Sequence, residues 1–133
     1  MQNMSPGKSA LGLDANVVAG LCYVPLCYLN LILSIITLVT DKTNKLARFH
    51  AFQSLFLTAG LIVVMILYFC AGIVGAILDN ALGYAVFTSV LGILSMILGL
   101  ALLIAVVIAA IKGFQGQIFK LPIIGNLADK YSG

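Results

Sequence analysis

Three long stretches of the chain are almost entirely apolar and contain no Asp, Glu, Lys or Arg. They cover residues 15–40, 49–78 and 80–111. About 20 consecutive apolar residues are enough for a helix to cross the hydrocarbon core of a bilayer. Because the third stretch is longer than one span needs, we interpret residues 80–87 as an interfacial lead-in, with a short re-entrant piece as the alternative. The pattern predicts an all-α membrane protein, a bundle of three transmembrane helices at about 15–40, 49–78 and 88–111.

Each stretch carries a stripe of small and polar residues at alternating spacings of four and three. The stripes include Asn16, Gly20, Tyr23, Asn30, Ser34 and Thr37, then Ser54, Thr58, Gly72 and Gly75, then Gly92, Ser95, Gly99, Ala109 and Gly113. This heptad spacing is typical of left-handed helix packing. Since lipid is as apolar as Leu, helices in membranes associate through close backbone approach at small residues. We therefore expect the stripes to face one another, and Leu at Gly92 or Gly99 to loosen the bundle.

Asn30 is the most polar residue near the centre of the first predicted span. One interpretation places it in a solute path. The favoured one is a hydrogen bond to a neighbouring helix that fixes register, because intramembrane pathways usually recruit ionisable residues. Pro25 in the same span is expected to kink the helix, since proline leaves a backbone carbonyl without its helical partner.

Composition supports the membrane assignment. Charged residues make up 8% of the 133 residues and hydrophobic residues 62%, whereas ordinary globular domains are about 25% charged. A soluble fold of this size cannot bury that much apolar surface. The composition therefore excludes a soluble enzyme, a disulfide-stapled secreted domain and a disordered tail.

The placement of the basic residues predicts an orientation. Three lie in the loop of residues 41–48 and three in the tail of residues 112–133. Basic residues near span ends tend to stay in the cytoplasm. With three spans in a transmembrane domain of residues 15–111, both basic segments lie on the cytoplasmic side of the cell membrane. The N-terminal arm of residues 1–14 then lies outside.

Sequence motifs for chemistry are lacking. Cys22 and Cys27 are not in a C-x-x-C pair, and the single histidine cannot complete a zinc site. There is no G-x-S-x-G, H-E-x-x-H or P-loop motif. We therefore expect no enzymatic activity, no cofactor, no metal and no nucleic-acid partner.

Two polar clusters remain as candidate interaction sites. The first is the sequence RFHAFQS, in which Arg48, His50 and Gln53 lead into the second span. It fits either an interfacial anchor or a protein-docking surface, and Arg48 is expected to extend to the headgroups. His50 is expected to stay neutral and to hydrogen-bond within the bundle, because positive charge nearby disfavours its protonation.

The second cluster, KLPIIGNLADK, begins at Lys120 and includes Pro122. It is too short and too broken for a fourth span, so we expect a short interfacial lid on the cytoplasmic leaflet. Leu121, Ile123 and Ile124 would dip into the interface, beside a collar of basic residues that faces anionic headgroups. A flexible, solvated tail is the alternative for the last ten residues.

The segments SALGLDAN, RFHAFQS and KLPIIGNLADK also carry a family resemblance. Together they resemble small bacterial and archaeal membrane proteins of unknown function that are similar to the chloroplast inner-envelope Tic import component. The match extends from about residue 9 to 131, with the motifs in family order. The resemblance implies a role in protein translocation or in the assembly of membrane complexes, and it transfers no catalytic residue.

Two functions follow from these observations. The first is a non-enzymatic accessory or assembly component whose partners are the anionic bilayer and other membrane proteins. The second is a small channel or carrier, which the polar stripe through Asn30 favours. Three helices barely enclose a pore, so a channel requires a homo-oligomer.

Overall fold

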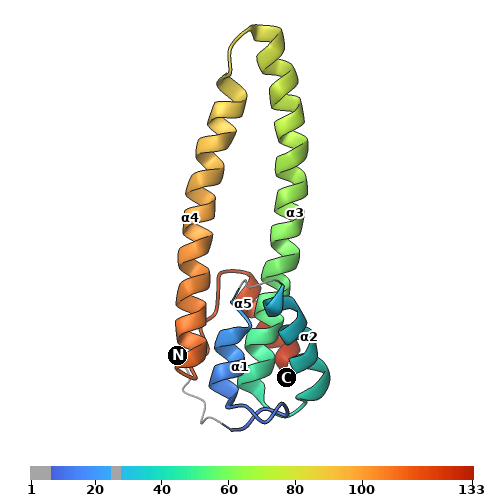
Figure 1. Ribbon diagram of the computed structural model, residues 1–133, viewed down its shortest axis with the longest axis vertical. Helices are drawn as coiled ribbons and strands as arrows, with labels where there is room; N and C mark the ends of the chain where they lie inside the picture. Colours follow the sequence, from blue (N-terminus) through green and yellow to red (C-terminus); the bar gives the residue numbers. More distant parts are fainter. Residues whose placement is uncertain (1–6, 25–27) are drawn as a thin grey trace. The chain divides into compact units, whose positions relative to one another are not determined.

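The computed structural model describes residues 7–24 and 28–133. Within these ranges the secondary structure is helical, apart from one isolated bridge between Lys8 and Asp14. The helices are α1 (Ala15–Leu21), α2 (Leu29–Thr40), α3 (Lys45–Leu82), α4 (Val86–Phe114) and α5 (Ile124–Ser132), coloured in sequence order in Figure 1. The expected all-helical architecture is confirmed, and two of the helices, in place of the three expected, are candidate membrane spans among the described residues.

The chain divides into two compact units. The hairpin unit is Ala59–Ile104, and the terminal unit combines Met1–Thr58 with Ala105–Gly133. Helices α3 and α4 each contribute to both units, while the other three helices belong to the terminal unit.

The hairpin unit is a pair of antiparallel helices joined by a tight turn. Gly83 provides the turn with a φ of +74°, a conformation that side chains rarely adopt. The carboxylate of Asp79 accepts hydrogen bonds from the backbone N–H groups of Phe87 and Thr88, at 2.8 and 2.9 Å. It therefore satisfies N–H groups that the first turn of α4 leaves without helical partners. Residues 80–87 do not form a separate lead-in segment, because α3 continues to Leu82 and α4 begins at Val86.

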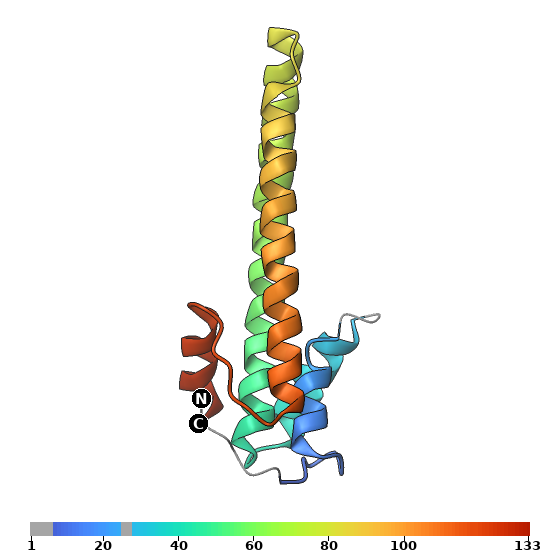
Figure 2. The ribbon, with the colours of Figure 1, turned by 90° about the vertical axis from the view of Figure 1, so that its left-hand side faces the viewer.

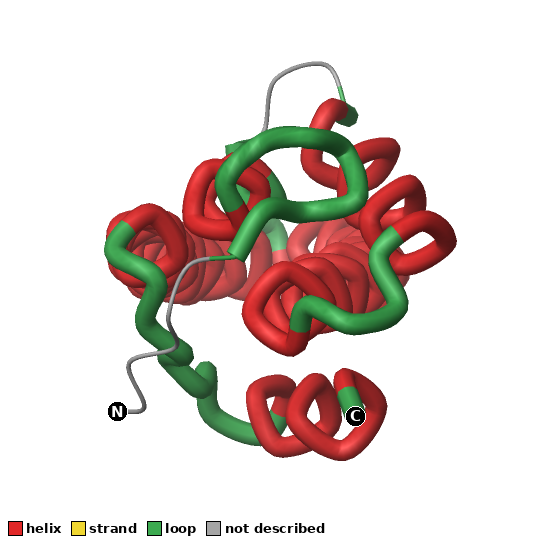
Figure 3. Tube along the Cα trace, turned by 90° about the horizontal axis from the view of Figure 1, so that it is seen from below, coloured by secondary structure: helices red, strands yellow, loops and turns green. Residues whose placement is uncertain are grey.

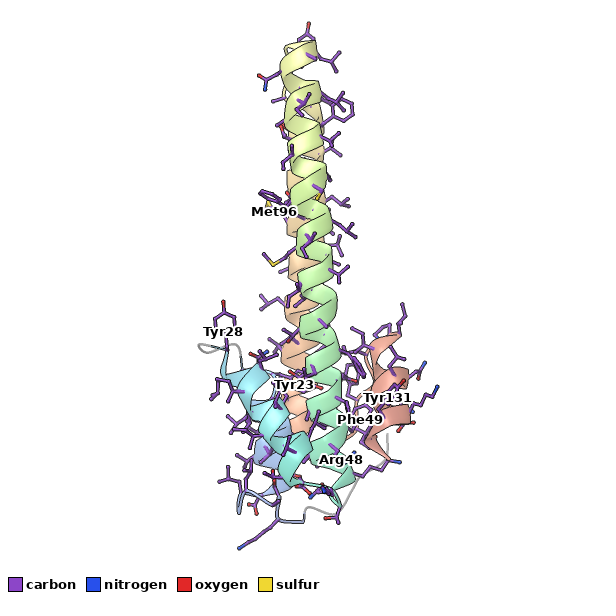
Figure 4. All side chains as sticks on the ribbon, turned by 90° about the vertical axis from the view of Figure 1, so that its right-hand side faces the viewer. Tyr23, Tyr28, Arg48, Phe49, Met96 and Tyr131 are labelled. Atoms are coloured by element: carbon purple, nitrogen blue, oxygen red, sulfur yellow. The ribbon has the colours of Figure 1, made fainter. Side chains whose placement is uncertain are left out.

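Large apolar side chains cover the outside of the hairpin unit. Met65, Phe69 and Met96 are 70%, 69% and 75% exposed, and Met96 points outward in Figure 4. Both α3 and α4 are long and apolar enough to cross a membrane. Such a surface is stable in lipid and would be strongly unfavourable in water.

The first predicted span does not form a single helix. Residues 15–40 are divided between α1 and α2, which have 7 and 12 residues. At 1.5 Å per residue these helices are about 10 and 18 Å long, well short of a hydrocarbon core of about 30 Å. Helix α2 begins after Tyr28, whose positive φ of 62° interrupts the helical path. Pro25, where we expected a kink, lies outside the described residues.

The N-terminal arm contacts the loop that precedes α3. The backbone N–H of Ala10 donates a hydrogen bond to the buried carboxylate of Asp41 at 3.1 Å, and Asn44 N–H donates to the other carboxylate oxygen at 3.1 Å. The sequence-based topology placed the arm and this loop on opposite faces of a membrane. That arrangement is incompatible with a direct hydrogen bond between them, so the predicted separation is wrong.

Close helix packing occurs at glycines of the terminal unit. A Cβ atom on Gly113 of α4 would lie 2.9 Å from the backbone of Ala19 and Gly20 in α1, and one on Gly20 would collide with the ring of Phe114. A Cβ on Gly92 or Gly99 would meet nothing within 4 Å. The expectation that these two glycines allow close approach is therefore wrong, because no neighbouring atoms pack against them. The tightly packed end of that stripe is Gly113.

Candidate interaction site at the start of α3

The RFHAFQS segment forms the first turns of α3 and lies between two other parts of the terminal unit. Figures 2 and 3 show α1 and α2 on one side of it and α5 on the other. His50 and Gln53 are fully buried and carry the contacts that join these parts.

His50 connects the end of α1 to the segment after α4. Its Nε2 faces the backbone carbonyl of Gln117 at 3.1 Å, and its Nδ1 lies 3.0 Å from the hydroxyl of Tyr23. A carbonyl only accepts, so Nε2 carries the proton, and Nδ1 accepts from the Tyr23 hydroxyl. Both nitrogens of a neutral ring are thereby satisfied, and the expectation that His50 hydrogen-bonds within the bundle is confirmed.

Gln53 uses both ends of its amide. Its Nε2 donates to the Tyr23 hydroxyl at 2.9 Å and to the backbone carbonyl of Phe119 at 3.0 Å. Its Oε1 accepts from the backbone N–H of Leu121 at 3.3 Å. A single side chain thus satisfies two backbone groups of an irregular segment that has no helix of its own to satisfy them.

Arg48 binds main-chain oxygens of the terminal unit. Its Nε donates to the carbonyl of Ser132 at 3.1 Å, and its Nη1 donates to the carbonyl of Asp41 at 3.3 Å. The guanidinium also lies over the ring of Phe52, 5.7 Å from its centroid. The expectation that Arg48 extends to headgroups is therefore wrong, because its donors join the end of α5 to the loop before α3.

Aromatic packing completes the contact between α5 and α3. Tyr131 lies against Phe52 and Phe56, with ring centroids 6.2 and 5.9 Å away. Figure 4 shows Tyr131 beside the first turns of α3. On the other side of α3, Ser54 donates to the carbonyl of Cys22 at 2.5 Å. The RFHAFQS segment is therefore a clamp that holds α1 and α5 to α3.

The Lys120–Lys130 segment is ordered by a close backbone approach. A Cβ on Gly125 would lie 2.6 Å from Cα of Lys120, so a side chain does not fit there. Lys120 Nζ lies 2.8 Å from Asp129 Oδ2, and this hydrogen bond holds the pKa of the Asp129 carboxyl below its usual value. Pro122 is exposed. Leu121 is buried, so it does not dip into an interface as expected, whereas Ile123 is 80% exposed.

The other predicted site residues lie apart from this clamp. Asn30 of α2 donates to the hydroxyl of Thr58 in α3 at 3.4 Å, which is the interhelical bond of the register interpretation. In the hairpin unit, Ser95 and Gly99 line an open apolar groove of about 570 Å³. The hydroxyl of Tyr68 lies 3.4 Å from that of Ser95.

Comparison with known proteins identifies the family. The chain matches the family model described as the magnetosome magnetite crystal formation protein family, MamF_MmsF, over residues 14–128. The chain belongs to this family. The matched region begins at the residue before α1 and ends inside α5, so it contains the whole clamp.

Three archaeal relatives are described as UPF0132 membrane proteins. One from Methanocaldococcus jannaschii is 32% identical over 126 residues, which cover 95% of this chain and 96% of the relative. A second from the same organism is 28% identical and covers 92% and 73%. One from Archaeoglobus fulgidus is 30% identical and covers 89% and 95%. No solved structure matches. These findings support a family of small membrane proteins, and they show no similarity to the Tic component.

Sequence reasoning missed Tyr23 and Gly113 as site-forming residues. Both lie on the predicted stripes, but the stripes mark every small or polar position equally. Their importance depends on which helices cross there. Among the described residues, no group of three or more His, Cys, Asp or Glu is placed to hold a metal ion.

Proposed function

We propose that the chain is a non-enzymatic multi-pass membrane component that assembles with other membrane proteins. The observation that carries this proposal is the surface of the hairpin unit. Its two helices expose apolar side chains along their length. In the most apolar 18-residue stretch of each helix, 6% of the stretch is buried. A surface of this kind is covered by lipid or by other apolar helices.

The proposed topology has two spans, α3 and α4, with both termini in the cytoplasm. All seven Lys and Arg residues lie in the terminal unit and none in the hairpin unit. This is the strongest bias that the positive-inside tendency can produce. The contact between Ala10 and Asp41 supports the same arrangement. In it, α1 and α2 enter and leave the membrane on the cytoplasmic side.

The clamp supports a structural role for the terminal unit. Its polar side chains are occupied by hydrogen bonds to one another and to the backbone. A group that acts on a substrate needs a free donor, acceptor or nucleophile. The clamp residues instead fix the positions of α1 and α5 within the terminal unit.

Two settings for this assembly role come from likeness alone. The Tic resemblance suggests a translocation system, and the family description concerns magnetite crystal formation. The proposal does not include a role in mineral formation, since the described residues hold no group of three or more His, Cys, Asp or Glu placed to bind a metal ion. Assembly with membrane proteins is the part of the proposal that rests on the chain's own surface.

The proposal is tested by affinity isolation in mild detergent, followed by mass spectrometry and a native mass measurement. We expect recurrent membrane-protein partners. The Gln53→Ala variant should lose those that bind the terminal unit, because the clamp then opens. Gln117→Ala is the matched control, since the side chain of Gln117 bonds to Lys112 and only its backbone carbonyl contributes to the clamp. A symmetric oligomer without partners, whose reconstituted vesicles conduct a solute, would instead establish the channel or carrier alternative.

A further inference from the structure

Helix α5 has two faces of different character. Gly125, Ala128 and Ser132 are buried against the rest of the terminal unit. Ile123, just before the helix, and Leu127 lie on the opposite side, with 80% and 42% of their surface exposed. The N–H of Leu127 donates to the carbonyl of Ile123 at 3.4 Å, so the two residues are neighbours at the start of α5, and we call them the apolar ridge.

The backbone conformation that places the Ile123 side chain at the surface of the terminal unit is strained. Its φ of +67° is rare for any side chain and strained for a β-branched one. The turn persists because Gly125 N–H donates to the carbonyl of Leu121 at 2.8 Å, while Leu121 N–H donates to Gln53. Strained positions that the surroundings enforce tend to be functional. Here the strained residue exposes a large apolar side chain at the surface of the terminal unit.

Basic residues flank this ridge. The side chain of Lys120 is 46% exposed just before the ridge, and exposed Lys130 lies three residues after Leu127, on the same face of α5. Their acidic neighbour Asp129 bonds to Lys120. The terminal unit as a whole carries all seven basic residues of the chain and three of its four acidic ones. An apolar ridge with positive flanks complements an anionic interfacial surface.

We propose that α5 is a membrane-surface anchor that binds anionic phospholipid. Ile123 and Leu127 insert among the acyl chains at the cytoplasmic interface, and Lys120 and Lys130 contact the phosphate groups. The clamp holds the anchor in place through Arg48 and Gln53. This inference rests on the proposal that α3 and α4 cross the membrane.

The absence of tryptophan from the chain allows a direct test. Single-Trp variants Ile123→Trp, Thr43→Trp and Ile97→Trp of the full chain are reconstituted in vesicles of phosphatidylcholine, with or without phosphatidylglycerol. Some acyl chains are brominated to quench nearby Trp fluorescence. Thr43 is the matched control, because it is exposed and neutral in the loop before α3. Ile97, 62% exposed in the hairpin unit, reports the span.

We expect quenching of Trp at positions 97 and 123 but not at 43. Phosphatidylglycerol should increase the quenching at 123 by at least twofold, and the added substitutions Lys120→Gln and Lys130→Gln should abolish that increase. Thermal unfolding in detergent checks that each variant is folded.

The outcomes separate the two proposals. Without quenching at position 97, the proposed membrane span fails. Quenching at 97 with water-like emission at 123 overturns only the anchor. Quenching at 123 that is the same with and without phosphatidylglycerol overturns the anionic-lipid assignment. Protection of 123 from lipid, together with cross-linking between copies or to another protein, would show that the ridge is a protein interface.

Discussion

Individual side chains in the terminal unit replace the backbone partners that irregular segments lack. Gln53 is the clearest case, because it satisfies the Phe119 carbonyl and the Leu121 N–H while it is fully buried. The same side chain donates to Tyr23, which in turn donates to His50. A connected network of this kind loses several bonds when one member is removed.

Replacement of Gln53 by Ala should destabilise the terminal unit strongly. Each buried polar group left without a partner costs about 1–3 kcal/mol, so we expect a loss of about 3 kcal/mol in the free energy of unfolding. Thermal unfolding in mild detergent measures it, and limited proteolysis should show earlier cleavage in residues 115–132. Gln117→Ala serves as the control with a smaller loss, since it removes only the side-chain bond to Lys112 and keeps the backbone carbonyl that His50 contacts. Equal stability of the two variants would contradict the clamp.

The glycines of α4 should differ sharply in their tolerance of a methyl group. Gly113→Ala places Cβ against the backbone of α1, and overpacking of this kind costs about 1–3 kcal/mol. Gly99→Ala should be neutral or slightly stabilising, because nothing lies within 4 Å and Ala favours the helix. Unfolding temperatures in detergent measure both. A larger loss for Gly99→Ala than for Gly113→Ala would restore the packing role first expected for Gly99.

Among the helices, the hairpin depends on the carboxylate of Asp79 at its turn. This side chain accepts the first free N–H groups of α4 and also the Thr88 hydroxyl. Asp79→Ala leaves those N–H groups to water, so the first turn of α4 should fray. Hydrogen exchange at Phe87 and Thr88 in detergent should become faster. Asn80→Ala is the control, since that side chain bonds only within its own helix, to Ala76. Unchanged hydrogen exchange in Asp79→Ala would show that the carboxylate does not stabilise the turn.

Helices α1 and α2 show why apolar length alone is a weak guide to spanning. Residues 15–40 are apolar enough for a span, but α1 ends at Leu21 and α2 begins at Leu29. Ser34 and Thr37 of α2 are fully buried, so the stripe facing inward was a better predictor than the expected span. A stripe of small and polar residues indicates which side of a helix is buried. The length of an apolar stretch indicates only how far the stretch would extend as one continuous helix.

For the whole molecule, the two-span topology predicts which positions face outward. On a background without the native cysteines, Lys8→Cys and Lys45→Cys should both resist a membrane-impermeant thiol reagent applied from outside. Tyr84→Cys, in the turn between α3 and α4, should react, because this side chain is 71% exposed. Permeabilised cells provide the control in which all exposed positions react. Labelling at position 8 but not at 45 would support the three-span arrangement instead.

The sequence by itself determined the membrane class, the two long apolar helices and the RFHAFQS segment as a candidate interaction site. These depend on apolar length, scarcity of charge and a distinctive local motif, all of which are properties of short segments. Only the tertiary structure decided that α1 and α2 are separate, that Gly113 rather than Gly99 is tightly packed, and that Arg48 binds backbone carbonyls. Each of these depends on which part of the chain packs against a residue. Gly113, for example, packs against Gly20, which is far away in the sequence. A local pattern shows that a position is small or polar, but only the folded chain supplies its partner.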